Sequence, residues 1–346
     1  MHGQQVNAPR DTNPQMIKEA ADEVWQILNW PMQANPKERD SSQFWAVIIG
    51  IDNYPHHHIY GCVSDAELVE KYIIEDLGVP SDHIQRLLGP SGEKTTDDST
   101  IPTHANIIRT LYSLIDNPDI VNGDNIIVYF AGLGASYDAE EYYRRTVPLD
   151  IPMTVPIMPT NALCPIDRET FDDTGAEILD ISDREIDAIF TQISQEKGHK
   201  ITLILDCGHS CMRIKSVPPL GTRRTTRNVP SLSPNSIKPM LEGAHQRLAA
   251  YPQYLARRSV AAHDWQPDPS SHVVLAACLE SEFAREEEDD TGIHGVFTKS
   301  LVDVLRSGQL KKGSTYVDLI SGLPQFFCQT PFVSGDHKGE AIWYQE

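Results

Sequence analysis

The sequence has few cysteines, little positive charge and no long hydrophobic run. Its six cysteines are too few and too scattered for a disulfide framework in 346 residues, which indicates a reducing compartment. Lys and Arg total 29 against 49 Asp and Glu, and the formal charge of −20 disfavours nucleic acid and anionic membranes as partners. No apolar run reaches the ~18 residues of a membrane helix, and the first residues lack a signal-peptide pattern. We expect a soluble, cytoplasmic protein.

Beyond residue 43, apolar runs alternate with amphipathic helical patterns. Strand-like runs occupy residues 44–51, 83–89, 125–130, 200–206 and 272–278. Capping-box pairs predict helix starts at Ser64 with Glu67 and at Ser182 with Glu185, and further helical patterns cover 107–115 and 294–307. This alternation predicts an α/β fold with a mainly parallel sheet covered on both faces. The polar residues 1–43 are predicted to form an N-terminal arm.

Chemistry in such sheets gathers at the carboxyl ends of the strands. The third and fourth predicted strands end in AGLG (131–134) and DCGHSC (206–211). The first turn lacks the sequence of a dinucleotide loop, and the spacing in the second matches no common zinc pattern. The histidines at 56–58 and the acidic run EEEDD at 286–290 are metal candidates, but solvated loops explain both better.

An ordered series of motifs resembles the caspase-type peptidases, especially fungal metacaspases, over about residues 44–345. The series is AVIIGIDNYP, YGCVSDAE, LGVPSDHIQRLLG, NIIVYFAGLGAS, LCPID, ISDREI, LILDCGHS, HVVLAACLESEFA, HGVFTKSL and STYVDLISGLPQFFCQTP. The resemblance implies a three-layer α/β/α caspase-like domain at 44–346. Its large part would span 44–215, its connecting loop 216–268 and its small part 269–346.

The resemblance also implies a cysteine endopeptidase, but both catalytic positions have changed. Leu133 stands where the family has its catalytic His, and Gly208 stands where it has its nucleophilic Cys. Neither residue can form a thiolate–imidazole pair. The backbone amides of Gly134 and Gly208 could still form an oxyanion hole. An alternative is a relocated nucleophile, Cys211 with His209.

Other family positions are retained. Arg or Lys before the cut would be recognised by Cys62, Asp65 and Asp206, with Ser136 a weaker match; the two carboxylates could instead serve local backbone groups. The segment GTRRTTRN resembles the family's self-cutting site, with Arg223, Arg224 and Arg227 as target residues, or it is a surface loop. Calcium is the one cofactor implied, at Asp167 and Asp183, although Ser182 replaces a usual acid.

Three functions follow from these observations. The first is a pseudo-peptidase, a non-catalytic regulator that binds peptides or proteins carrying Arg or Lys, or active metacaspase relatives. The second is a cysteine endopeptidase cleaving after Arg or Lys, through a relocated nucleophile or as an inactivated variant of an active enzyme. The third is a purely structural interaction protein that uses the N-terminal arm.

Overall fold

The computed structural model describes residues 41–89, 98–146, 158–209, 222–251, 259–327 and 329–345. Every described element belongs to one compact unit, the second unit of the chain, Ser41–Glu346. Nearly all of the predicted N-terminal arm therefore lies outside the described residues, as does Cys211.

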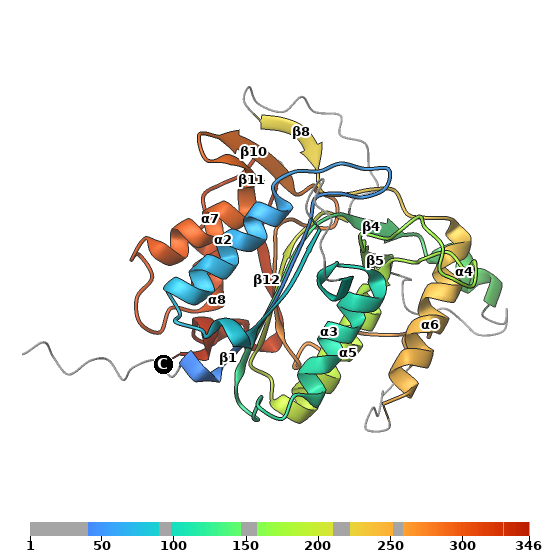
Figure 1. Cartoon of the computed structure of the whole chain (residues 1–346), viewed down its shortest axis with the longest axis horizontal. Coiled ribbons are helices and arrows are strands. Elements are labelled where there is room, and N and C mark those ends of the chain that lie inside the picture. The colour runs from blue at the N-terminus through green and yellow to red at the C-terminus, as the bar shows by residue number, and fades with distance from the viewer. Residues whose placement is uncertain are drawn as a thin grey trace, which may run out of the picture. The chain divides into compact units, whose positions relative to one another are not determined.

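A six-stranded sheet forms the centre of the second unit, in the order β12-β9-β7-β3-β1-β2 (Figure 1). Five neighbouring strands are parallel, and β12 pairs antiparallel with β9 at one edge. The strands are β1 (Phe44–Ile51), β2 (Ile84–Gly89), β3 (Asn125–Ala131), β7 (Ile201–Asp206), β9 (Val273–Ala276) and β12 (Phe332–Ser334). All five predicted strands are present, and the central strands β1 and β3 are buried on both faces along their whole length.

Helices cover both faces of this sheet, which confirms the predicted three-layer α/β/α fold. One face carries α2 (Cys62–Glu75), α7 (Val296–Arg306) and α8 (Tyr316–Ser321), and the other carries α3 (His104–Asp116), α5 (Asp183–Lys197) and α6 (Ile237–Ala249) (Figure 1). Short helices complete the described unit: α4 (Glu140–Thr146), η1 (Ser41–Gln43), η2 (Ser81–His83), η3 (Asp98–Thr100), η4 (Pro234–Ser236), η5 (Asp336–Gly339) and η6 (Ile342–Tyr344). Among the described residues, no helix is long and apolar enough to cross a bilayer.

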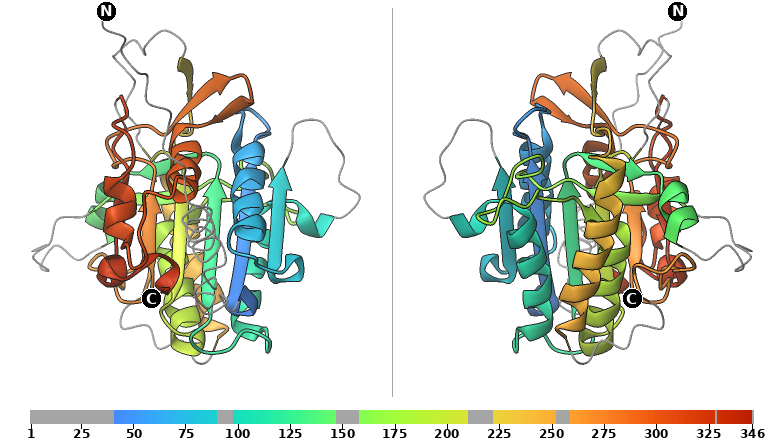
Figure 2. Two further views of the ribbon diagram at one scale, coloured as in Figure 1. Left: turned by 90° about the vertical axis from the view of Figure 1, so that its left-hand side faces the viewer. Right: turned by 90° about the vertical axis from the view of Figure 1, so that its right-hand side faces the viewer.

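Two small three-stranded sheets accompany the main sheet (Figure 2). One contains β4 (Gly134–Tyr137), β5 (Thr160–Leu163) and β6 (Ile181–Ser182), and the other contains β8 (Thr222–Thr226), β10 (Arg285–Asp289) and β11 (Gly292–Gly295). The interpretation of EEEDD as a solvated loop is therefore wrong in part. Most of this run lies in the β10–β11 hairpin, and Glu286 is fully buried.

The two capping-box predictions had different outcomes. Ser182 caps α5 by accepting a hydrogen bond from the Glu185 amide, as predicted. The predicted start at Ser64 is wrong, because α2 begins at Cys62. There the side chain of Asp52, which follows β1, accepts hydrogen bonds from the amides of Cys62 and the next residue (2.7 and 3.3 Å). A carboxylate from outside the helix thus replaces the local cap.

The predicted connecting loop at 216–268 contains more regular structure than a loop. Its described residues include β8 and the whole of α6. The buried residues of α6 recur at the three- and four-residue spacing of an amphipathic helix, which is visible in the sequence: Ile237, Met240, Leu241, Ala244 and Leu248.

Candidate functional site

The carboxyl ends of β3 and β7 lie side by side, as the sequence predicted, because Ala131 pairs with Asp206 in the parallel ladder. Leu133 and Gly208 follow these strand ends. The Leu133 side chain is buried with 1% of its surface exposed, and its amide donates to the Tyr54 hydroxyl (2.9 Å). Neither position offers a group that can attack a carbonyl or move a proton.

The two predicted oxyanion-hole amides converge on one acceptor, which belongs to the chain itself. The carbonyl oxygen of Arg227 accepts hydrogen bonds from the Gly208 amide (2.8 Å) and the Gly134 amide (3.1 Å). Two convergent backbone donors are the arrangement that stabilises an oxyanion during acyl transfer. Here they hold the carbonyl of an intact peptide bond.

The side chain of Arg227 fills the predicted acidic pocket. Its guanidinium lies 2.5 Å from Asp65 Oδ2, 2.9 Å from Asp206 Oδ2 and 3.6 Å from Glu286 Oε1, and all four side chains are fully buried. Planar guanidinium groups favour this kind of multidentate carboxylate pairing. The predicted pocket thus already contains an arginine, which comes from the predicted self-cutting segment.

Neighbouring groups fix the carboxylates around the guanidinium. Asp65 accepts the Gly295 amide (2.7 Å), and Asp206 accepts the Thr298 hydroxyl (2.6 Å). A Cβ placed on Gly295 would lie 2.2 Å from Asp206 Oδ2 and 2.6 Å from Arg227 Nη1. Only glycine leaves room at this point for the ion pair.

The pocket holds three acidic groups against one cation, and this excess appears in the pKa of Asp65. Burial raises the pKa of Asp65 to about 7; Arg227 opposes the rise, and nearby Asp206 adds to it. For Arg227, burial lowers the pKa, but Asp206, Asp65 and Glu286 together with Cys62 outweigh it and raise the pKa well above its usual value. The arginine is thus charged at any physiological pH.

Backbone pairing holds residues 222–229 across the site in an extended conformation. β8 pairs antiparallel with β10, and the Arg227 amide donates to the Ala284 carbonyl (3.1 Å). Beyond the arginine, Asn228 forms a parallel bridge with Gly134, whose carbonyl accepts the Val229 amide (2.9 Å). Peptides that bind by strand addition adopt this arrangement. The segment thus pairs through its backbone with Ala284 and β10 before and at the arginine, and with Gly134 beyond it.

Residues 45–216 match the family described as "Metacaspase, peptidase C14 domain". The match includes both strand ends and two of the three pocket carboxylates. These residues belong to the metacaspase family. The fold is also similar to the crystal structure of protein GSU0716 from Geobacter sulfurreducens, with a TM-score of 0.50 and 14% identity over 88% of this chain and 97% of that chain. At this identity the likeness bears on the fold alone. The comparison with curated proteins gives no significant match.

Within the metacaspase domain, the predicted pocket residues are only partly brought together. Asp65 and Asp206 meet at the guanidinium, and buried Cys62 begins α2 close by. Ser136 lies in β4 opposite Asn161 and is not among the residues that pair with the guanidinium. Arg223 and Arg224 lie in β8.

Sequence reasoning missed two parts of the metacaspase pocket. It did not place Arg227 inside the pocket as a ligand, and it did not find Glu286 as a third carboxylate. The signal for Glu286 was the turn sequence DDTG, which begins with the last two residues of the acidic run and connects two strands of a hairpin.

One cysteine and one histidine lie close together near these positions in the metacaspase domain, but they are not activated. Cys207 Sγ lies 3.7 Å from His209 Nε2, and both side chains border a cavity of about 360 Å³. Burial raises the pKa of the Cys207 thiol well above its usual value and lowers the pKa of His209 to about 4. Both groups are therefore neutral, the opposite of a reactive ion pair. The relocated nucleophile Cys211 lies outside the described residues.

The two predicted calcium ligands serve different helices. Asp167 accepts the His104 amide at the start of α3 (2.9 Å), whereas Asp183 at the start of α5 accepts the amides of Asn161 and Arg184 (3.2 and 2.8 Å). Both carboxylates thus already complete local hydrogen bonding, and within the described ranges neither joins a cluster suited to a metal. Calcium binding stays a prediction.

Asp187 borders the same cavity, and its replacement by asparagine should stabilise the fold at high pH. Burial raises the pKa of Asp187 to about 7. Because the folded carboxyl holds its proton more tightly than the unfolded one, its stability contribution falls between about pH 4 and pH 7 and stays low above that. We expect D187N to gain about 1–2 kcal/mol in unfolding free energy at pH 8 and much less at pH 5.

Urea unfolding at the two pH values measures this difference. Asparagine keeps an acceptor for the Asp268 amide, which donates to Asp187 at 3.1 Å, so the comparison isolates the charge. The exposed Asp303 gives a matched control, D303N, that should change little at either pH. A gain for D187N that is equal at both pH values would contradict the assignment.

Proposed function

We propose that this chain is a non-catalytic member of the metacaspase family, a pseudo-peptidase that keeps an arginine-recognition pocket and fills it with its own Arg227. One observation carries the proposal. The Arg227 guanidinium pairs with buried carboxylates and its carbonyl accepts the Gly134 and Gly208 amides, whereas Leu133 and Gly208 lack the reactive groups.

The chemistry of the two positions supports the loss of activity. In other hydrolases, removing a nucleophile–base unit lowers turnover by roughly a million-fold, and backbone oxyanion donors retain only a small rate over water. The buried Cys207 and His209 are neutral and do not replace the missing pair. The cleft can therefore hold a peptide without cutting it.

The occupied pocket defines how the protein would meet a partner. A tethered segment competes with incoming peptides at an effective concentration in the millimolar range. An outside Arg or Lys peptide would thus bind weakly while Arg227 is seated, and more tightly when it is displaced. This favours a regulated, partner-binding role, with active relatives or basic proteins as partners.

The parent chain should show no peptidase activity. We expect no thiol-sensitive hydrolysis of fluorogenic Arg or Lys peptides, with or without calcium, from the purified chain. The chain should also stay intact on prolonged incubation, because Gly208, which lies beside the Arg227 carbonyl, has no nucleophilic side chain. Hydrolysis that purifies with the protein and disappears on thiol alkylation would instead support the endopeptidase alternative.

A further inference from the structure

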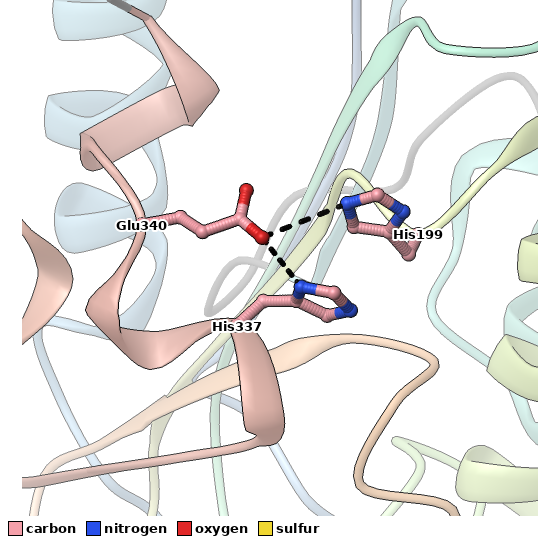
Figure 3. Close-up of side chains that lie close together, drawn as sticks. All are labelled: His199, His337 and Glu340. Atoms are coloured by element: carbon pink, nitrogen blue, oxygen red, sulfur yellow. Dashed lines mark hydrogen bonds and ion pairs between the residues drawn. The ribbon is translucent and has the colours of Figure 1, made fainter.

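A cluster of two histidines and a glutamate lies away from the arginine pocket. His199 immediately precedes β7, whereas His337 and Glu340 lie in and just after η5, beyond the edge strand β12 (Figure 3). The arginine pocket lies at the opposite end of β7, where the strand finishes at Asp206. The cluster is therefore independent of the proposed function.

The three side chains converge on one point. His337 Nδ1 lies 2.6 Å from Glu340 Oε1, and His199 Nε2 lies 3.9 Å from the same oxygen. Figure 3 shows both nitrogens directed at this carboxylate. One potential ligand atom from each residue lies within 4.8 Å of the other two. The two imidazole rings stack at a centroid distance of 4.0 Å.

The backbone around the cluster is anchored, although the side chains reach solvent. The Tyr344 hydroxyl donates to the His199 carbonyl (3.2 Å), and the Glu340 amide donates to the His337 carbonyl (3.0 Å). The exposed fractions of the side chains are 42% for His199, 23% for His337 and 46% for Glu340. An ion can enter from solvent onto ligands whose main chains are already in place.

The donor set selects the type of metal. Two imidazoles and one carboxylate, with a further position open to water, suit Zn²⁺ and neighbouring first-row ions better than calcium or magnesium, which prefer oxygen ligands.

We propose that His199, His337 and Glu340 form a zinc-type metal site that ties the C-terminal segment to the start of β7. The ion replaces the hydrogen bond between His337 and Glu340 and holds both histidines. Because His199 and His337 are 138 positions apart in the chain (337 − 199), the ion would act as a crosslink between distant segments.

Metal binding to the whole chain tests the site. Accessible thiols are first alkylated, so that Cys211 and Cys328 cannot contribute, and the metal-free protein is titrated with Zn²⁺ by calorimetry and with Co²⁺ by visible absorption. We expect one ion per chain, a tetrahedral Co²⁺ spectrum and a rise in melting temperature with Zn²⁺. The double variant H199Q/H337Q should lose all three signals, and E340Q should bind at least about ten-fold more weakly.

The matched control is H56Q/H57Q/H58Q, which removes the adjacent histidine run and should leave all three signals unchanged. Circular dichroism without metal should be alike in every variant, since the substituted side chains all reach solvent. No ion bound to the parent chain overturns the proposal. Binding that survives in H199Q/H337Q, or that disappears in the control, assigns the metal elsewhere and overturns it too.

Discussion

Restoring the two family residues with G208C and L133H is expected to make the chain cut itself between Arg227 and Asn228. A Cβ on Gly208 would lie 3.6 Å from the Arg227 carbonyl oxygen, so a sulfur there comes within reach of the adjoining carbonyl carbon. The same oxygen already accepts two backbone N–H groups. The added imidazole would activate the thiol and protonate the leaving amine.

The expected gain is large, because a nucleophile–base unit accounts for roughly a million-fold in turnover in other hydrolases. The new Cβ would meet the Ala284 amide at 3.2 Å, which requires a shift of a few tenths of an ångström and is compatible with folding. Intact mass measurement with and without calcium should find two fragments, 1–227 and 228–346, and N-terminal sequencing should begin at Asn228.

Two variants separate this reaction from other cleavage. G208A/L133H has the same Cβ without sulfur and should stay intact. G208C/L133H/R227Q keeps the dyad but lacks the guanidinium, so it should be cut far more slowly at this bond. A folded G208C/L133H chain that stays whole, or that is cut only after Arg223 or Arg224, would show that residues 222–229 do not lie in a reactive pose.

Arg227→Ala is expected to lose about 3–5 kcal/mol of unfolding free energy at pH 8, the range for breaking a buried ion pair by removing one partner. The variant leaves Asp65, Asp206 and Glu286 buried without their cation. The loss should shrink towards pH 5. The pKa of Asp65 in the folded parent is already raised to about 7, and removing the arginine raises it further. As the pH falls, protonation of the buried carboxylates therefore restores more unfolding free energy to the variant than to the parent.

Urea unfolding measures the loss, and agmatine tests its cause. Agmatine carries a guanidinium and should restore part of the stability of R227A without affecting the parent, whose pocket is filled. R227K keeps the positive charge but lacks the planar guanidinium, so its unfolding free energy should lie between those of R227A and the parent chain. If R227A is too unstable to purify, R227K and its agmatine response give the same test.

R306A is the matched control for this experiment. Arg306 also pairs with a carboxylate, Asp76 (2.6 Å), but at the partly exposed surface, so its loss should cost under about 1 kcal/mol. Equal losses for R227A and R306A, or no response of R227A to agmatine, would contradict the assignment of Arg227 as a buried pocket ligand.

Much of this architecture could be predicted from local sequence patterns. The continuous apolar runs predicted the five parallel strands, and adjacency of parallel strand ends predicted that positions 133 and 208 would meet. The helix cap at Ser182 could be predicted because its partner, the Glu185 amide, lies only three residues away. The start of α2 could not be predicted in this way, because its cap comes from Asp52, which lies ten residues before Cys62 across a loop.

The contents of the pocket depend on contacts that no local pattern contains. Three arginines lie in the segment GTRRTTRN, and nothing in their spacing singles out Arg227, which is selected by the pairing of β8 with β10. Glu286 is buried although it opens an acidic run whose other members are mostly exposed. The cluster of His199, His337 and Glu340 likewise has no sequence motif, because the first residue precedes β7 and the other two follow β12.

The neighbouring positions of β7 and β9 have a consequence for the integrity of the molecule. The chain leaves β7, passes through residues 207–272 and returns as the adjacent parallel strand β9. Asp65 and Asp206 lie before residue 210, whereas Arg227 and Glu286 lie after residue 221. A nick between 210 and 221 would therefore release no fragment: the two pieces would remain partners in one sheet, joined by its ladder and by the buried arginine.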